Sequence, residues 1–511
     1  MGRRAARPRW RRALLLLVLV AGALLVSVVS AQRPACAADT PSARDGKTAD
    51  TRPVVRVGTE GTYPPFTYAD PKTGDLTGFD IEVIRAVAAK AGWDLRFTTG
   101  SFDSLFPALD AHRIDVIANQ VTINPDRQAH YLFSRPYTYS RGVIVTAADT
   151  DDITTLADLK GRTAAESQTS NWAQVARDAG ARIQYVDQFS QAAALLAQGR
   201  VDAIVNDNIA VLDYLATSGS TKVKIAGDAG SEISRQALAF RRSDADLRDQ
   251  ADRALAALAE DGTLAKLSKK YFGADVSVAN PGKVEVKGSN AGRSTWQVVQ
   301  DTAWPMLRET LKGTIPLTAV SFVCGLVIAL AVALARMSSY RLLSLPARVY
   351  ISIIRGTPLL VQLFIVFYGL PEIGVDLPSF VAACLALSLN VGGYAAEVVR
   401  ASILSVPRGQ FEAATTIGMD YWQGMRRIVL PQAARIAVPP LSNTLLSLVK
   451  DTSLASVVLV TEMLREAQVA ASVSTRFMAL YCLAALYYWV ICYLISLGQH
   501  RLERRLGRYA T

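Results

Sequence analysis

Apolar residues follow two different spacings along the first half of the chain. Residues 54–58 form a short β-rich run, and residues 81–91 place apolar side chains at helical spacing. Strand-like alternation follows at residues 93–97, and the β-rich runs 114–118 and 201–205 each come directly after a helical pattern. Strand and helix patterns that alternate predict a parallel or mixed sheet covered by helices. Because the last two runs have similar surroundings, we expect two similar α/β lobes in a domain spanning residues 52–275.

Two segments beside this domain lack its pattern. Residues 1–37 combine a basic start, an apolar run and small residues, which predicts a signal peptide or an N-terminal anchor and an exported domain behind it. Residues 276–300 contain Pro281-Gly282 and Gly288-Ser289-Asn290 and have no apolar period. Such composition is typical of a linker.

Residues 301–511 have a different pattern, in which arginine-rich loops separate long apolar stretches. A helix needs about 20 residues to cross the hydrocarbon of a bilayer. Five stretches are candidate spans: residues 315–335, 359–370, 380–399, 436–460 and 477–497. The second is short, and the fourth is interrupted by Pro439-Pro440 and Lys450-Asp451. We therefore predict an all-α membrane domain of about five spans.

Arginine placement predicts how these spans are oriented. Arginines gather between the first and second spans, between the third and fourth spans, and in the tail. The turn at residues 371–378 carries Glu372 and Asp376 and no basic residue. The positive-inside rule then places the loop at about 402–435 and the C-terminus in the cytoplasm. With five spans the α/β domain lies outside a plasma membrane, as the export segment also indicates.

Composition excludes several other classes. The formal net charge is +11 over 511 residues, but much of the excess comes from arginines that flank apolar stretches. We therefore expect no nucleic-acid partner. The five cysteines offer no CxxC metal site and no disulfide framework. The chain also lacks the GxxxxGK[ST] phosphate loop, so we expect no cofactor on this chain and ATP hydrolysis on a separate subunit.

Several short motifs occur in a fixed order along the α/β domain. They include residues 58–66 (GTEGTYPPF), 78–80 (GFD), 119–127 (NQVTINPDR), 133–137 (FSRPY) and 261–264 (DGTL). Together they resemble the polar amino-acid family of solute-binding proteins of ABC importers, whose members bind His, Glu, Gln, Arg or cystine. The resemblance implies a two-lobed periplasmic-binding-protein type II fold.

The resemblance also implies a site for an α-amino acid. A zwitterion taken out of water needs a partner for each charge. Arg127 would hold the α-carboxylate with its planar guanidinium, and Asp207, from the other lobe, would bind the α-ammonium. The remaining site candidates are clamping aromatic residues, nearby polar side chains and a second-lobe loop: Glu60, Tyr63, Phe102, Gln120, Thr122, Thr169 and Ser170.

Structural alternatives remain open for these residues. Arg127 would also fit a surface ion pair, and Asp207 would fit a helix N-cap. Tyr63 and Phe102 would also fit a simple core. For the ligand, Asn119-Gln120 with residues 234–236 (SRQ) is similar to cystine-binding members. We expect L-cystine, with a general polar amino-acid or glutamine importer as the alternative.

A second set of motifs lies between the third and fourth predicted spans. Residues 408–414 (RGQFEAA), Gly418 and residues 430–432 (LPQ) resemble the "EAA" loop of permeases in the same transporter family. That loop implies a short helix pair that docks on the ATP-hydrolysing subunit. An ordinary surface helix is the alternative. The docking candidates are Gly409, Glu412, Ala413, Ala414 and Gly418.

Four polar residues at membrane depth are candidates for the translocation path: Asn390, Glu397, Lys450 and Asp451. Charged side chains are costly there unless they are paired or face a cavity. Structural bracing and hydrogen bonds between helices remain open alternatives.

These observations predict the binding and permease subunit of an ATP-dependent amino-acid importer, which is not itself an enzyme. We expect a cytoplasmic ABC ATPase and a second copy of the chain as partners. A ligand-gated channel would interrupt the two lobes with its pore segment, whereas residues 54–275 are continuous. A dehydratase-like enzyme is disfavoured by the Arg127 and Asp207 pair and by the attached permease.

Overall fold

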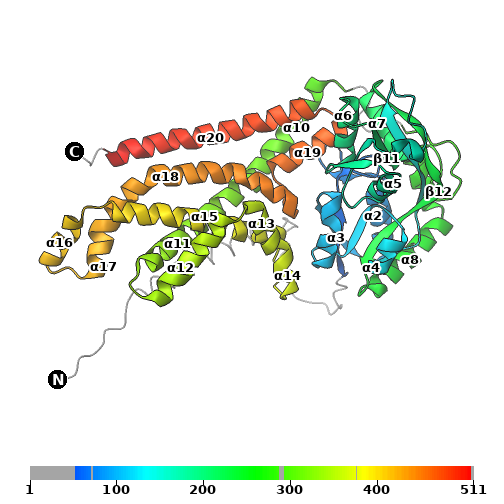
Figure 1. The fold of residues 1–511 in the computed structure, drawn as a ribbon. Helices are drawn as coiled ribbons and strands as arrows, with labels where there is room; N and C mark the ends of the chain where they lie inside the picture. The colour runs from blue at the N-terminus through cyan, green and yellow to red at the C-terminus, as the bar shows by residue number, and fades with distance from the viewer. Residues whose placement is uncertain (1–51, 71–72, 287–292, 376, 508–511) are drawn as a thin grey trace, which may run out of the picture. The chain divides into compact units, whose positions relative to one another are not determined.

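The computed structural model describes residues 52–70, 73–286, 293–375 and 377–507 (Figure 1). The predicted export segment, residues 1–37, lies outside the described residues. What is described forms two compact units. The first contains residues 52–309 and 463–485, and the second contains residues 310–462 and 486–507.

A nine-stranded mixed sheet is the frame of the first unit, as the alternating spacing predicts. Its strand order is β10-β9-β11-β8-β12-β6-β1-β5, and β7 pairs with β12. The strands are β1 (Val54–Thr59), β5 (Asp94–Thr99), β6 (Val116–Thr122), β7 (Tyr131–Phe133), β8 (Thr138–Ala147), β9 (Thr163–Glu166), β10 (Arg182–Tyr185), β11 (Ala203–Asp207) and β12 (Val223–Arg241). A small antiparallel sheet contains β2 (Thr62–Tyr63), β3 (Thr67–Ala69) and β4 (Leu76–Thr77).

Two long strands join two lobes of this unit. β12 pairs with β8 through most of its length and with β6 and β7 through its last residues. The first-lobe helices are α2 (Phe79–Ala91), α3 (Phe102–Asp110), α4 (Pro125–His130), α8 (Ala245–Glu260) and α9 (Thr263–Phe272). The second-lobe helices are η1 (Leu156–Leu159), α5 (Asn171–Asp178), α6 (Phe189–Ala197) and α7 (Asn208–Ser218). This is a type II two-lobed α/β domain.

Helix α2 shows how the sequence builds the first lobe. Its apolar residues recur at helical spacing, and Phe79, Val83, Ile84 and Val87 are buried in the first-lobe core. Burying a side chain of this size stabilises the fold by about 1.5–3 kcal/mol. The helix ends at Gly92, which adopts the left-handed conformation that glycine accommodates without strain.

The remaining helices carry most of the apolar stretches of residues 295–507. They are α10 (Thr295–Glu309), α11 (Ile315–Met337), α12 (Arg341–Gly356), α13 (Leu359–Phe364), α14 (Leu370–Glu372), α15 (Ser379–Leu404), α16 (Arg408–Thr416), α17 (Tyr421–Gly424), α18 (Leu430–Asp451), α19 (Met463–Ser474) and α20 (Phe477–Gly507). Short π or 3-10 segments adjoin them: η2 (Thr310–Thr314), η3 (Ile365–Gly369), η4 (Met425–Val429) and η5 (Thr452–Val458).

Within the described residues, three continuous helices are long and apolar enough to cross a membrane. They are Thr295–Met337, which joins α10, η2 and α11, Ser379–Leu404, which is α15, and Phe477–Arg504 within α20. Two further spans are possible if each of two bent helix pairs counts as one. The pairs bend by 112° between Gly356 and Leu359 and by 55° between Val458 and Met463. The first bend has a local cause, because Pro358 disfavours helical backbone at Thr357, which is extended.

Two sequence predictions differ from the structure. Helix α18 runs through Pro439-Pro440 without interruption, and the hydroxyl of Ser442 donates to the carbonyl of Val438 nearby. Membrane helices tolerate proline where neighbouring groups satisfy the carbonyls that lose their N–H donor, which here are those of Arg435 and Ile436. Helix α10 begins at Thr295, inside the segment 276–300 that we expected to be linker. Ser294 and Gln297 exchange hydrogen bonds as a capping box that starts this helix.

Small residues allow close contacts between helices of the second unit. A Cβ atom added to Gly325 of α11 would lie 2.5 Å from a methyl of Val391 in α15. Only glycine therefore permits this approach, as is usual where membrane helices pack closely.

Candidate ligand-binding site

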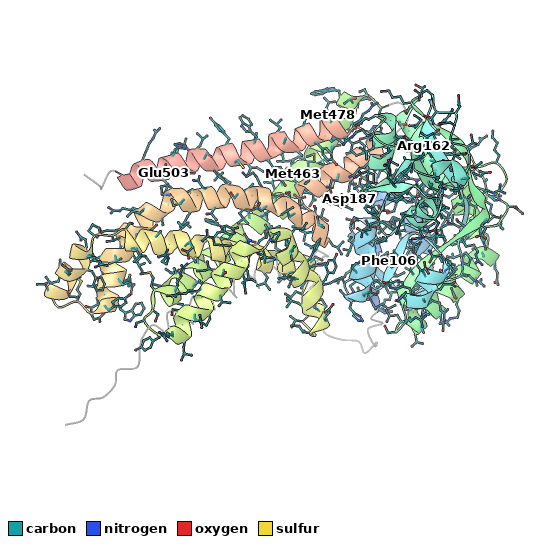
Figure 2. All side chains as sticks on the ribbon, viewed as in Figure 1. Phe106, Arg162, Asp187, Met463, Met478 and Glu503 are labelled. Carbon is teal, nitrogen blue, oxygen red and sulfur yellow. The ribbon has the colours of Figure 1, made fainter. Side chains whose placement is uncertain are left out.

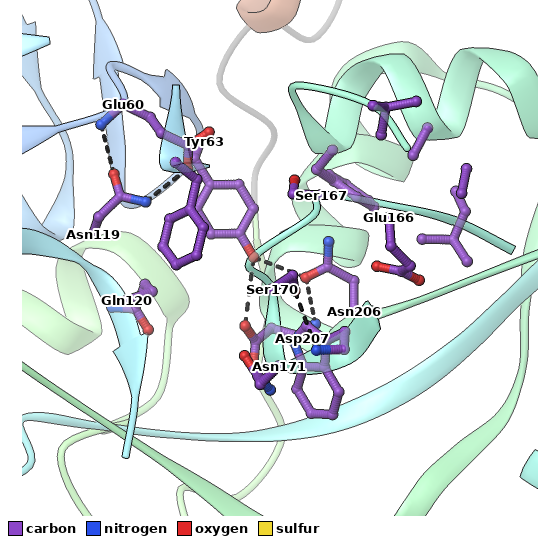
Figure 3. Close-up of a pocket in the computed structure, with 17 residues that line it drawn as sticks. Glu60, Tyr63, Asn119, Gln120, Glu166, Ser167, Ser170, Asn171, Asn206 and Asp207 are labelled. Carbon is purple, nitrogen blue, oxygen red and sulfur yellow. Dashed lines mark hydrogen bonds between the residues drawn. The ribbon is translucent and has the colours of Figure 1, made fainter. Parts of the chain in front are cut away.

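A cavity lies between the two lobes of the α/β domain (Figure 3). It encloses about 550 Å³ of empty space, a volume that includes its open mouth. Its lining residues are Glu60, Tyr63, Phe102, Asn119, Gln120, Ala165, Glu166, Ser167, Ser170, Asn171, Trp172, Val186, Phe189, Ala192, Ile204, Asn206 and Asp207.

Arg127 is buried at the start of α4 beside this cavity. Its Nη1 donates to the carbonyl of Thr122 at 3.0 Å, and its Nη2 donates to the carbonyl of Thr169 at 2.9 Å. The guanidinium lies 5.6 Å from the ring of Phe102 and 5.4 Å from that of Phe106, which Figure 2 labels. Burial lowers the pKa of Arg127 to about 10, so the side chain stays charged at neutral pH. A guanidinium has five N–H donors. These two hydrogen bonds use two of them, so the others are available to a carboxylate.

Asp207 ends β11 and is 3% exposed. One carboxylate oxygen accepts a hydrogen bond from the Ser140 hydroxyl, and the other accepts one from the Tyr63 hydroxyl at 3.4 Å. Burial raises the pKa of Asp207 to about 6, against the lowering effect of Ser140. Asp207 occupies the N-cap position of α7 but makes no side-chain cap hydrogen bond. Its carboxylate is therefore directed to the site and not to the helix.

Glu60 and Tyr63 form the first-lobe wall. The Glu60 carboxylate accepts a hydrogen bond from the Asn119 amide at 2.7 Å, and burial raises the pKa of Glu60 to about 7. The Tyr63 ring packs against Phe66 and, edge to face, against Phe189. The Tyr63 hydroxyl donates to Asn206 at 2.9 Å across the two lobes (Figure 3). Tyr63 is therefore both a core contact and part of the cavity wall.

Gln120 lies at a strained position of β6. Its φ is 49°, a value that non-glycine residues rarely adopt and that often occurs at functional sites. The buried carboxylate of Asp80 holds it, because its two oxygens accept from the Gln120 backbone N–H and side-chain amide. Burial raises the pKa of Asp80 to about 7. Asp80 therefore fixes the position of Gln120 in the cavity wall through these two hydrogen bonds.

A second set of hydrogen bonds joins the lobes at the edge of the cavity. Asp103 of α3 accepts from the Thr169 backbone N–H at 2.8 Å, from the Thr169 hydroxyl at 2.6 Å and from the Gln168 backbone N–H at 3.2 Å. Ser170 caps α5 through its hydroxyl, which accepts from the Trp172 N–H. These contacts hold the second-lobe loop next to Arg127.

The structure brings the predicted site residues together, with one division among them. Six line the cavity: Glu60, Tyr63, Phe102, Gln120, Ser170 and Asp207. Thr122, Arg127 and Thr169 contact one another at its edge and do not line it. Asp103, Asn119, Glu166 and Asn206 were not predicted. Asn119 stood inside a quoted motif, and Glu166 follows a short β-rich run, but neither position alone indicates a role.

The predicted docking loop is a pair of short helices, α16 and α17. Glu412 and Ala413 are exposed, while Ala414 is 1% exposed and packs beside Gly424. Gly418 has a φ of +82° at the turn between the helices, which favours glycine. Gly409 is exposed on α16.

Two of the four candidates for the translocation path, Asn390 and Glu397, have side-chain partners. Asn390 donates to Gln362 of α13 at 3.0 Å, a hydrogen bond between helices. Glu397 pairs with Arg336 and, at 3.1 Å, with Arg400. Among the described residues no ion pair joins Lys450 to Asp451. These contacts fit the bracing alternative for Asn390 and Glu397.

Comparison with known proteins divides the chain in the same way. Residues 55–274 match the bacterial extracellular solute-binding proteins of family 3. Residues 293–508 match the inner membrane component of binding-protein-dependent transport systems.

Two curated relatives from Bacillus subtilis match different halves. The L-cystine transport system permease protein TcyB is 54% identical over 217 residues, which cover 42% of this chain and 93% of the relative. The L-cystine-binding protein TcyA is 49% identical over 224 residues, or 44% of this chain and 83% of the relative. A solved structure of the unliganded L-cystine solute receptor of Neisseria gonorrhoeae is 43% identical, covers 45% of this chain and 96% of that one, and has a TM-score of 0.34.

These families are components of transporters and not enzymes, and in such systems ATP hydrolysis belongs to a separate subunit. The chain therefore belongs to the family 3 solute-binding proteins through its first half and to the binding-protein-dependent transport permeases through its second, fused in one polypeptide.

Proposed function

We propose that this chain captures L-cystine outside the plasma membrane and passes it to its own permease half. The coarser function, an amino-acid ABC transporter's binding protein and permease, follows from the family membership. The choice of cystine is supported by the two relatives from cystine systems, each of which matches one half of the chain at about 50% sequence identity.

The observation that carries the proposal is the placement of two buried opposite charges on different lobes. Arg127 begins α4 in the first lobe, and Asp207 ends β11 in the second lobe. The α-carboxylate would take bidentate hydrogen bonds from Arg127, and the α-ammonium would pair with Asp207. A ligand that bridges the lobes favours their closed arrangement, because it has more contacts there.

The proposal includes the partners that the chain itself does not supply. A cytoplasmic ATPase would dock on Glu412 and the exposed face of α16 and α17, and a second copy of the chain would complete the pore. The arginine-rich loops and tail favour a cytoplasmic C-terminus, with the α/β domain on the other side.

The experiment is calorimetry on the full chain in lipid nanodiscs. L-cystine, glutamine, glutamate, histidine and arginine are titrated separately. We expect L-cystine to bind at least about tenfold more tightly than the others, which corresponds to ~1.4 kcal/mol. Tighter binding of glutamine would replace cystine by the glutamine alternative, and no binding of any of the five would contradict the amino-acid site.

A further inference from the structure

Three carboxylates line the cavity of the α/β domain: Glu60, Glu166 and Asp207. No Lys, Arg or His side chain is among the lining residues that the structure describes. Asp207 is assigned to the α-ammonium, and Glu60 already accepts from the Asn119 amide and interacts with the positive charge of Arg465. A ligand with one ammonium group therefore leaves Glu166, whose described contact is the backbone N–H of Val205, without a cation. Because a buried carboxylate is costly without a partner, the wall is better matched to a ligand with more than one cationic nitrogen.

Glu166 is the carboxylate that the amino-acid zwitterion does not explain. It ends β9 in the second lobe, and the residue is 4% exposed. One of its oxygens accepts from the backbone N–H of Val205 in β11 at 2.6 Å. An ionised carboxylate has about four acceptor positions, so this single bond leaves room for a ligand N–H. Figure 3 shows Glu166 in the cavity wall on the side away from Glu60.

The bond to Val205 does not by itself require a charged residue. A glutamine carbonyl would accept the same backbone N–H without the cost of burying a charge. Burial raises the pKa of Glu166 well above its ordinary value, and a cationic group beside it would restore the ionised form. Glu60 differs, because the Asn119 amide already donates to it.

We propose that Glu166 is a specificity-determining residue that accepts a hydrogen bond from a second cationic nitrogen of the bound amino acid. The inference rests on the proposed amino-acid site and narrows its ligands to amino acids with a second ammonium or guanidinium group. L-cystine, with an ammonium at each end, belongs to this class, and so do dibasic amino acids.

Two pairs of ligands of matched shape test this proposal on the full chain in nanodiscs. S-(2-aminoethyl)-L-cysteine is compared with S-propyl-L-cysteine, in which a methyl replaces the ammonium. Arginine is compared with citrulline, in which the guanidinium is replaced by a neutral group. A charge-assisted hydrogen bond predicts a preference of about tenfold or more for the cationic member of at least one pair.

The Glu166→Gln variant should reduce that preference to about twofold or less, with affinity for the neutral ligand unchanged within about twofold. Thermal unfolding and neutral-ligand binding confirm that the variant is folded. Asp178→Asn removes an exposed carboxylate of the same lobe, outside the cavity lining, and is the matched control that should keep the preference. The proposal is overturned if wild-type protein prefers neither cationic ligand, if Glu166→Gln keeps the preference, or if Asp178→Asn loses it as well. Failure of L-cystine to bind wild-type protein would reject cystine as the ligand without deciding the role of Glu166.

Discussion

Arg127 and Asp207 are the residues on which the proposed capture of an amino acid depends. Both are buried, at 9% and 3% exposure, and each already has hydrogen-bond partners within the protein. The site is therefore preorganised, because the free side chains do not need to be ordered when the ligand arrives. Removing one partner of a buried charge pair typically costs about 2–5 kcal/mol.

Replacing Arg127 by alanine should therefore weaken binding of the preferred amino acid by at least about 30-fold. Arg127→Lys keeps the charge but loses the planar fork, so its loss should be partial. Arg135→Ala removes an exposed arginine of the same lobe and serves as the control. Near-normal affinity of Arg127→Ala in calorimetry would refute the proposed carboxylate contact.

The pH dependence of binding follows from Asp207, whose pKa burial raises to about 6. Below that pH the carboxyl is protonated and neutral, so it no longer pairs with an ammonium. The dissociation constant should rise as pH falls through about 6, approaching tenfold per pH unit. Burial also raises the pKa of Glu60, to about 7, and of Glu166, well above its ordinary value. Both are separated from this effect by Glu60→Gln and Glu166→Gln, each of which should keep a rise near pH 6. A dissociation constant that stays flat down to about pH 4.5 would contradict the role of Asp207.

At this scale the family resemblance pointed to the charged pair but not to its surroundings. Arg127 lies inside the motif at residues 119–127 that carries the resemblance, and Asp207 follows the β-rich run 201–205. The inter-lobe contacts of Asp103 and the support of Gln120 by Asp80 join residues 65 and 40 positions apart. No local pattern indicates such pairs, because they exist only once the sheet order is set.

In the permease half, α16 and α17 form the surface that we propose for docking of the ATPase. Ala414 is buried beside Gly424, so the two helices pack closely. On the same helix pair and its turn, the large apolar residues Ile417, Tyr421 and Trp422 are at least half exposed. Exposed apolar patches are typical of a surface that another protein or a membrane covers.

Changing Glu412 to lysine should abolish uptake and leave ligand capture intact, because the change reverses a charge on the docking surface only. Glu372→Lys reverses an exposed charge on the opposite turn of the permease and should leave uptake within about twofold of wild type. Uptake of radiolabelled amino acid in cells and calorimetry on the purified chain measure the two steps. Unchanged uptake by Glu412→Lys would remove the docking role.

Element types were predictable from spacing, whereas breaks within the membrane helices were not. The runs 54–58, 93–97 and 201–205 coincide with strands β1, β5 and β11 to within two residues. The uninterrupted α18 contradicts the break expected at Pro439-Pro440, whereas the bend at Thr357-Pro358 lies at a proline where no break was expected. Proline at the start of a helix disfavours helical backbone at the residue before it, so the preceding helix ends there. Inside a packed membrane helix, neighbouring groups compensate for the hydrogen bond that proline removes.

For the whole molecule, fusion changes how the two halves meet. A tethered partner acts at about millimolar effective concentration, so weak docking between binding domain and permease would suffice. The binding domain and the permease domain are also made in equal numbers, because one chain carries both. This arrangement works only if the two halves expose their sites on opposite sides of the membrane.

Labelling of single cysteines in intact cells tests that requirement most directly. In a chain whose five native cysteines are replaced, Ser243→Cys reports the binding domain and Thr416→Cys reports the docking loop. Both positions are exposed. We predict that a membrane-impermeant thiol reagent labels Ser243→Cys in intact cells and labels Thr416→Cys only after permeabilisation. Labelling of both positions from the same side would contradict an importer that binds its ligand outside and its ATPase inside.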